Sequence, residues 1–343
     1  MIEKTIFNND EEIIILAKKI YALDISKVEK INRGSANIYL LNEDQYVLKE
    51  FQSKYTKDEI EKEINVINHL SKFDIKVPEY VKTSSNKYYC VHKKKIIIIQ
   101  KYIEGYGLNN FEGTYEQTME CAEYYGKIVS ALKSLPVKLP DSDFSDLYSK
   151  ENFDNGIKKH KDLLVMLDAN NNVDKKIKED IEEKITMIKD VKNNMDFSEM
   201  KNLTMLNSHG DYNVLQFIYK NNKINAVIDF VSACKMPVVW ELIRSYSYID
   251  KEAKNGEFNI NNLVDYIKTF NKYITLNRYD IKYMVYLYLI QILNSDFGYK
   301  QYVSNHKKIN LLEFGYLRTN ICRYLFKNAN LITERLEKEL FNI

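Results

Sequence analysis

Residues 208–217 have the sequence SHGDYNVLQF and residues 226–230 have the sequence AVIDF, and these two stretches decide the fold. Asp211 follows His-Gly at the entrance of a loop, and Asp229 ends an apolar run. The carboxylate of Asp229 is therefore expected to project from the end of a buried strand. The intervening Lys-Asn-Asn-Lys at residues 220–223 favours a tight turn. The two stretches together predict a β-hairpin with one aspartate on each side.

Two aspartates in this arrangement suit phosphoryl transfer. One carboxylate can orient a hydroxyl and take its proton, while the other can hold Mg²⁺ against phosphate groups. Positioning and charge neutralisation do most of the work in such reactions. Phosphoryl transfer is therefore the chemistry that the hairpin predicts.

The segment resembles the catalytic and metal loops of the aminoglycoside phosphotransferase family, a kinase-like group related to choline, methylthioribose and homoserine kinases. The family pattern is His-Gly-Asp, an Asn five residues after the Asp, and Ile-Asp-Phe or Ile-Asp-Trp about fifteen to twenty residues further on, an arrangement related to that of protein kinases. The first and third parts match here. At the second part, Gln216 stands where the family has Asn, and Asn213 is only two residues after Asp211.

The resemblance implies a role for each of these residues. Asp211 would orient or deprotonate the acceptor hydroxyl, Asp229 would bridge the metal ions, and Gln216 would be a weaker metal ligand. His209 is expected to form structural hydrogen bonds rather than to act as a base. A His-x-Asp triplet can also be an ordinary capped turn, but Ile228-Asp229-Phe230 at the family spacing makes that alternative the weaker one.

The composition excludes several other classes of protein. The 343 residues allow one large or two medium domains, and 45% hydrophobic residues are ample for a core. A net charge of +2 gives no case for nucleic-acid binding. The four cysteines have no metal-type spacing, and no long apolar segment or amino-terminal signal is present, so we expect a cytoplasmic protein without a membrane span. It would be a monomer or homodimer.

The amino-terminal third predicts a nucleotide-binding lobe. A helix from Asn9 to about Leu23 precedes strands at 28–31, 38–41 and 45–51. The loop between the first two strands contains Gly34 and Ser35, which could cradle phosphates or form a plain hairpin turn. In the third strand, alternation places Lys49 on the same face as apolar neighbours, so it is either a surface lysine or the partner of an anion.

The next helix, residues 57–73, supplies a candidate anion for Lys49. Its apolar arc comprises Ile60, Ile64, Ile67, Leu70 and Phe73, and Glu63 falls within that arc. We therefore expect Glu63 to face the sheet and pair with Lys49. The resemblance agrees, because kinase-like folds use a strand lysine and a helix glutamate to fix the nucleotide phosphates.

The segment that follows is expected to hold the adenine. An isoleucine run at 96–99 predicts a central strand, and residues 100–105 resemble the family's hinge between two lobes. By that alignment Lys101 and Ile103 contribute main-chain contacts, and Gln100 lies behind the base. Because the backbone would make these contacts, the side chains matter little.

The remaining two-thirds is predicted to be mainly helical. Residues 114–135 and 173–188 form long amphipathic helices. Residues 234–244 resemble the family's Pro-x-x-Asp-Leu turn, with Glu in place of Asp. We expect Trp240 in that turn to pack in the core or between the lobes rather than to stack on a substrate. We likewise expect the tyrosines of the last hundred residues to belong to the helical core rather than to an acceptor cleft.

The fold class expected is α+β, a protein-kinase-like two-lobed fold with a small antiparallel-sheet lobe and a larger mainly helical lobe. Residues 1–99 would bind ATP, 100–105 would be the hinge, and 106–343 would carry catalysis and acceptor binding. The expected function is ATP- and Mg²⁺-dependent phosphorylation of a small-molecule hydroxyl. The alternative, favoured by Gln216, is a kinase-like protein without catalysis, such as a spore-coat-associated one.

Overall fold

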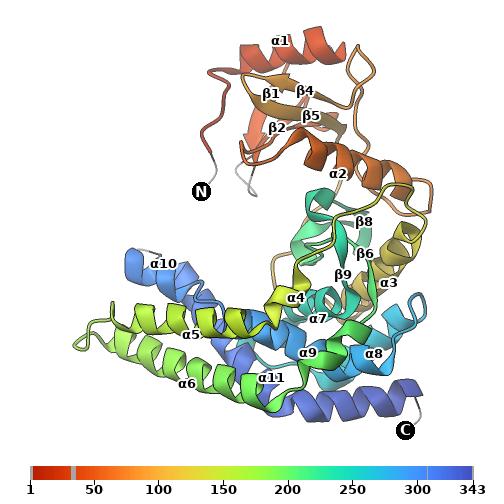
Figure 1. The fold of residues 1–343 in the computed structure, drawn as a ribbon. Helices are drawn as coiled ribbons and strands as arrows, with labels where there is room; N and C mark the ends of the chain where they lie inside the picture. Colours follow the sequence, from red (N-terminus) through yellow and green to blue (C-terminus); the bar gives the residue numbers. More distant parts are fainter. Residues whose placement is uncertain (1–2, 32–35, 307, 342–343) are drawn as a thin grey trace.

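The protein, described by a computed structural model over residues 3–31, 36–306 and 308–341, has two lobes joined by one connection (Figure 1). A small sheet-based lobe lies above a larger helical lobe in that view. The predicted α+β, two-lobed architecture is confirmed. Gly34 and Ser35 lie outside the described residues.

The small lobe is a five-stranded antiparallel sheet with a helix on each face. The strand order is β1-β2-β3-β5-β4. Side chains of α1 pack against Ile97 and Ile99, whereas α2 shares a cluster with Ile96 and Ile98. An uninterrupted isoleucine run therefore suits β5, because both of its faces are covered. The elements are α1 (Asp10–Tyr21), β1 (Val28–Ile31), β2 (Asn37–Leu41), β3 (Tyr46–Glu50), α2 (Lys57–Leu70), β4 (Tyr89–His92) and β5 (Lys95–Lys101).

Two boundaries differ from those predicted. Helix α2 ends at Leu70, and Phe73 lies beyond it with 39% of its surface exposed, so Phe73 is not part of the buried arc. Strand β5 continues to Lys101, because Gln100 pairs with Val47 and Lys101 pairs with Tyr46. The first two residues of the predicted hinge thus belong to the sheet.

The large lobe packs helices around two short two-stranded sheets. In one of them β6 pairs with β9, and in the other β7 pairs with β8. Its helices are α3 (Tyr115–Leu132), α4 (Phe144–Leu147), α5 (Lys150–Leu164), α6 (Asn172–Asn194), α7 (Val238–Ile249), α8 (Ile260–Asn271), α9 (Arg278–Leu293), α10 (Tyr299–Ser304) and α11 (Ile309–Phe341). Its strands are β6 (Met205–Ser208), β7 (Phe217–Lys220), β8 (Lys223–Val227) and β9 (Cys234–Pro237). Short 3-10 turns are η1 (Phe197–Asn202), η2 (Val214–Gln216), η3 (Phe230–Ser232) and η4 (Lys251–Asn255). None of the helices formed by the described residues has the length and apolar character needed to cross a bilayer.

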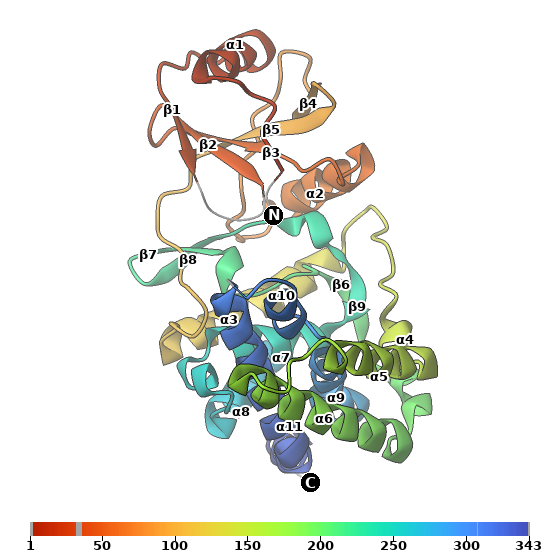
Figure 2. The ribbon, with the colours of Figure 1, turned by 90° about the vertical axis from the view of Figure 1, so that its left-hand side faces the viewer.

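The predicted hairpin is present and lies between the lobes (Figure 2). Its turn residues Asn221 and Asn222 both have positive φ, as a tight two-residue turn requires. The connection from the small lobe is bonded to β7, since Tyr106 and Tyr219 exchange backbone hydrogen bonds of 2.8 and 2.7 Å. A Cβ on Gly105 would approach the carbonyl oxygen of Tyr219 to 2.3 Å, so only glycine fits there. The hairpin is thereby held against the interlobe connection.

Candidate active site

The loop that carries Asp211 begins where β6 ends. Gly210 has φ +84°, and a Cβ on it would lie 2.0 Å from the carbonyl oxygen of Ser232, so the close approach requires glycine. His209 Nε2 lies 3.0 Å from the carbonyl oxygen of Ile228 and therefore carries the ring proton. Its Nδ1 accepts the backbone N–H of Asp211 at 3.3 Å. The imidazole thus ties the loop to β8.

Three side chains surround the carboxylate of Asp211. Arg244 donates from Nη2 to Oδ1 at 2.7 Å, and Asn213 Nδ2 lies 3.3 Å from the same oxygen. Gln216 donates from Nε2 to Oδ2 at 3.1 Å. The side chain of Asp211 nevertheless stays 39% exposed, so a hydroxyl can reach it. The carboxylate is held by its neighbours on one side and open on the other.

The side-chain amides of Gln216 and Asn213 differ in whether their oxygen is already hydrogen-bonded. The Oδ1 of Asn213 accepts the backbone N–H of Leu215 at 2.9 Å and so caps the turn η2. Because a carboxylate only accepts hydrogen bonds, the nitrogen of Gln216 must face Asp211, and its carbonyl oxygen points elsewhere. That oxygen has no hydrogen bond to any residue that the structure describes. Gln216 therefore has the free amide oxygen that a hard cation would need, and Asn213 does not.

Asp229 leaves β8 in the left-handed conformation, with φ 68° and ψ 58°. This backbone state is uncommon, and aspartate is one of the residues that adopt it. Its Oδ1 accepts Lys49 Nζ at 2.9 Å. Burial is the largest influence on Asp229 and opposes its ionisation, but the charge and the hydrogen bond of Lys49, with other nearby positive groups, together leave the pKa of this carboxyl below its usual value. Asp229 is thus a carboxylate that links the two lobes.

The ion pair predicted between Lys49 and Glu63 is not formed. Glu63 is 1% exposed, and its carboxylate lies near the hydroxyl of Tyr80 and the backbone of Phe230, but no well-formed hydrogen bond from the described residues reaches either oxygen. Burial raises the pKa of Glu63, and the nearby ammonium of Lys49 only partly offsets this. Periodicity placed Glu63 on the correct face, but Asp229 lies within bonding distance of the ammonium and takes the hydrogen bond. Burial also opposes the charge of Lys49, yet the carboxylates of Glu63 and Asp229 together raise its pKa.

The residues expected to hold the base differ in whether their backbone N–H groups are free to bind it. The backbone N–H of Lys101 donates to Glu79 at 2.9 Å, so that group is already engaged. The backbone N–H of Ile103 makes no hydrogen bond within the part of the chain that the structure describes. Gln100 is paired with Val47 in the sheet. The expected main-chain contact therefore fits Ile103 better than the amide of Lys101.

Two charged residues of α7 were not predicted to belong to the site. Glu241 is fully buried, accepts the backbone N–H of Tyr212 at 2.7 Å and also accepts the hydroxyl of Ser208. Arg244, one turn later, reaches Asp211. The resemblance of residues 234–244 to a family turn was a signal for Glu241, whereas for Arg244 the only signal was its spacing from Glu241 on one helix face.

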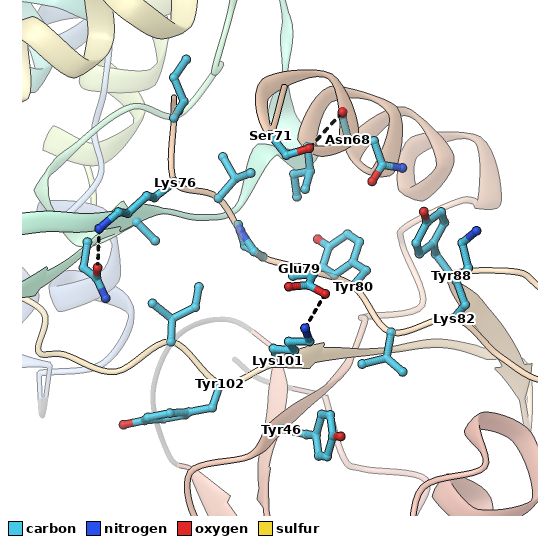
Figure 3. Close-up of a pocket in the computed structure, with 18 residues that line it drawn as sticks. Tyr46, Asn68, Ser71, Lys76, Glu79, Tyr80, Lys82, Tyr88, Lys101 and Tyr102 are labelled. Carbon is cyan, nitrogen blue, oxygen red and sulfur yellow. Dashed lines mark hydrogen bonds and ion pairs between the residues drawn. The ribbon is translucent and has the colours of Figure 1, made fainter. Parts of the chain in front are cut away.

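A hollow of about 860 Å³ lies beside the interlobe connection (Figure 3). It is walled by the extended segment 75–82, the end of β5 and part of β8. The ion pair between Lys101 and Glu79, at 2.6 Å, lies among the residues that line the hollow. Asp211, Asp229 and Lys49 do not line it. It is therefore separate from the cluster of charged groups described above.

Comparison with known proteins gives a consistent result. The sequence profile described as the Phosphotransferase enzyme family matches residues 27–269. Among curated proteins, none matches the sequence significantly. The solved structures that resemble it share its fold at low identity. One is an aminoglycoside phosphotransferase from Alicyclobacillus acidocaldarius, with a TM-score of 0.66, 14% identity, and coverage of 97% of this chain and 98% of that one.

Two further similar structures contain nucleotides. A spectinomycin phosphotransferase, solved with ADP and spectinomycin, has a TM-score of 0.63 and 15% identity over 95% of this chain and 98% of that one. An amicoumacin kinase, solved with AMP-PNP, Ca²⁺ and Ami, has a TM-score of 0.57 and 14% identity over 95% and 94% of the two chains. These likenesses show the fold of the chain.

Proposed function

The chain belongs to the phosphotransferase enzyme family, and from this premise we propose that it transfers the γ-phosphoryl group of ATP, with Mg²⁺, to a hydroxyl of a small molecule. The observation that carries the proposal is that the hairpin between the lobes holds two bonded pairs, Lys49 with Asp229 and Gln216 with Asp211. A backbone hydrogen bond of 2.9 Å from Ile228 to Gln216 ties the two pairs together. The similar structures bound to ADP or to AMP-PNP with Ca²⁺ support the use of a nucleotide and a divalent cation.

The residues present fit a hard divalent cation. Asp229 offers a carboxylate whose Oδ2 has no hydrogen-bond donor among the described residues, and Gln216 offers its free amide oxygen. Oxygen ligands of this kind are what Mg²⁺ prefers. When bound, the cation would neutralise charge on the phosphates. Lys49 would then be released from Asp229 to hold phosphate oxygens, with Glu63 near enough to stabilise its charge.

We assign Asp211 to the acceptor. Its exposed carboxylate would accept the hydroxyl proton and aim the oxygen, which is the contribution that a positioned base makes. Gly34 and Ser35 would approach the phosphates, and Gln100, Lys101 and Ile103 would surround the base. Residues 1–99 and 106–343 would be the nucleotide and acceptor lobes, with 100–105 between them, in a cytoplasmic monomer or homodimer.

One observation favours a second candidate, a kinase-like protein without catalysis. Gln216 is one methylene longer than the family's Asn, and Mg²⁺ tolerates displaced ligands poorly. Such a protein would bind nucleotide or a partner without turnover. The charged residues of the site are all retained, which favours the enzyme.

The test combines nucleotide binding with an acceptor screen. Thermal shift with ATP, with and without Mg²⁺, is followed by measurement of ATP consumption across amino-alcohols, sugars, aminoglycosides and other antibiotics. We expect Mg²⁺-dependent stabilisation by ATP and phosphorylation of at least one alcohol. Binding of MgATP with no turnover on any acceptor would favour the second candidate. No binding of ATP at all would contradict the first candidate and leave only a protein that binds a partner.

A further inference from the structure

Helix α7 presents two opposite charges to the loop of Asp211. Glu241 binds the loop backbone at the N–H of Tyr212, at 2.7 Å. Arg244, one turn further along, binds the side chain of Asp211 at 2.7 Å through Nη2, and its Nη1 lies 3.5 Å from the carbonyl oxygen of Tyr212. One helix face therefore contacts both the backbone and the carboxylate of the same loop.

The guanidinium of Arg244 is itself fixed in place. The rings of Trp240 and Tyr248, one turn before and one turn after it, both lie 5.4 Å from its central carbon. Trp240 is in turn held by a hydrogen bond of 3.2 Å to Gln291. The side chain of Arg244 is 16% exposed, so water screens its charge poorly. Burial alone would lower the pKa of Arg244, but the charge and the hydrogen bond of Asp211, with smaller effects of Tyr248 and Tyr288, together raise it.

The donors leave a defined vacancy on the carboxylate of Asp211. An ionised carboxylate offers about four acceptor positions on its two oxygens. Arg244 and Asn213 take positions on Oδ1, and Gln216 takes one on Oδ2. A hydroxyl that arrives from the exposed side then meets a carboxylate already locked in orientation. Such fixed geometry contributes to rate without a large change in substrate affinity.

We propose that Arg244 is a positioning residue that sets the orientation of Asp211 for the acceptor hydroxyl. This inference rests on the proposed function. Arg244 acts through Asp211 and is not among the residues that we assign to the nucleotide or the metal. A lysine cannot replace it, because only the planar fork of arginine can point one nitrogen at the carboxylate of Asp211 and another at the carbonyl of Tyr212.

The test compares Arg244→Ala, Arg244→Lys and a matched control, Arg278→Ala, in the full-length protein. Arg278 begins α9, is exposed, and bonds only to the hydroxyl of Tyr279 among the residues described. With ATP and the acceptor found by the screen, Arg244→Ala should lower kcat about a hundredfold. The KM for ATP should stay within about twofold, since the nucleotide contacts are intact. Arg244→Lys should recover little, and Arg278→Ala should match the parent.

Two readouts separate positioning from a merely structural role. Added guanidinium chloride should restore part of the lost kcat in Arg244→Ala, because the cation can enter the gap between Trp240 and Tyr248, and should not help Asp211→Asn. In thermal unfolding, the Tm losses of Arg244→Ala and Asp211→Asn should be less than additive in the double variant, as expected for residues in contact. Equal kcat in Arg244→Ala and the parent, or loss that guanidinium does not relieve, would overturn the inference while the proposed function stands. No turnover in the parent would overturn both.

Discussion

Lys49 is the residue that we assign to the nucleotide phosphates. Its ammonium bonds Asp229 at 2.9 Å, and its side chain is 19% exposed. Phosphate oxygens would compete for the same ammonium. Lys49→Ala should therefore weaken ATP binding by roughly 1.5–3 kcal/mol, the range for a hydrogen bond to a charged group. Isothermal calorimetry measures this.

The matched control for Lys49 is Lys27, which forms an exposed ion pair with Glu43 at 2.9 Å. Lys27→Ala should leave ATP affinity unchanged, because an exposed pair of this kind contributes little. Equal ATP affinity in Lys49→Ala and the parent would remove Lys49 from the phosphate site.

Gln216 is one of the residues at which this chain departs from the family pattern. The structure assigns its amide nitrogen to Asp211 and leaves its oxygen free, whereas the oxygen of Asn213 caps η2. In a Mg²⁺ titration of nucleotide binding, Gln216→Asn should keep or improve the Mg²⁺ affinity and Gln216→Ala should weaken it. Asn213→Ala should reduce stability by about 1 kcal/mol through the lost cap but keep the Mg²⁺ response. Loss of the response in Asn213→Ala alone would mean that the loop adopts a different register in the complex.

At this scale, short-range pattern identified the residues but not all of their partners. The positions of Asp211 and Asp229 follow from a motif and a hairpin turn that are contiguous in the chain. Arg244 contacts Asp211 only because α7 packs under the loop at one rotation, and no local pattern specifies that rotation. Glu63 was placed on the correct face by periodicity, but which of two carboxylates bonds Lys49 depends on distances between lobes.

Among the elements, the carboxyl end of α9 shows how helices of the large lobe are fixed to one another. The last carbonyl groups of a helix lack partners within it. Here His160 of α5 donates to the carbonyl of Leu293 at 2.7 Å, and Lys184 of α6 donates to that of Ser295 at 2.6 Å. Arg318 of α11 donates to the hydroxyl of Ser295 at 3.0 Å. Basic groups from three helices thus cap a fourth, where the helix dipole is negative.

Two of these caps predict how stability depends on pH. Burial lowers the pKa of His160 to about 4 and that of Lys184 to about 8. Both folded values lie below the unfolded ones, so the unfolded chain binds more protons and stability rises with pH in each window. Stability should therefore fall as the pH drops from about 6.5 to 4 through His160, and from about 10.5 to 8 through Lys184. Each effect is at most roughly 3 kcal/mol.

Chemical unfolding across these two windows checks the prediction. His160→Gln keeps a donor for Leu293 but cannot titrate, so the acid-side loss should shrink in that variant. Lys184→Met should flatten the alkaline window and leave the acid window as it is in the parent. Identical pH profiles in the parent and both variants would show that these side chains reach water in the folded protein.

Most elements follow from the sequence, and the differences lie where elements meet. Strand β1 and the hairpin turn occupy the predicted residues, because turn chemistry and alternation are local properties. Strand β5 runs on into the expected hinge because Tyr46 and Val47 offer it partners, a long-range effect. Nothing in the period of α1 indicated which sheet face it covers, whereas the structure packs it against Ile97 and Ile99.

For the whole molecule, the hairpin β7–β8 is one of the parts that join the lobes, beside the packing of α2 on α3. On the side of the connection, Asn225 donates to the carbonyl of Glu104 at 2.9 Å, and the backbone N–H of Val227 donates to the carbonyl of Lys76 at 3.0 Å. At the exit of β8, Asp229 reaches Lys49 of the small lobe. The contact between Asp229 and Lys49 joins two charged groups that both belong to the proposed nucleotide site. Closure of the lobes and nucleotide binding should therefore be linked through Asp229.

Asparagine substitutions separate this linkage from the chemistry at Asp211. Asn adopts the left-handed conformation as Asp does, so Asp229→Asn should keep the backbone at φ 68° while removing the charge. We expect it to abolish the Mg²⁺ dependence of nucleotide binding, because the cation loses its carboxylate. Asp211→Asn should instead lower turnover by at least about a hundredfold and leave MgATP binding nearly unchanged, because Asp211 serves only the acceptor. Calorimetry with and without Mg²⁺, together with turnover, distinguishes the two. If both variants lose the Mg²⁺ response and turnover to the same extent, the two aspartates act as one unit and the division of roles between them is wrong.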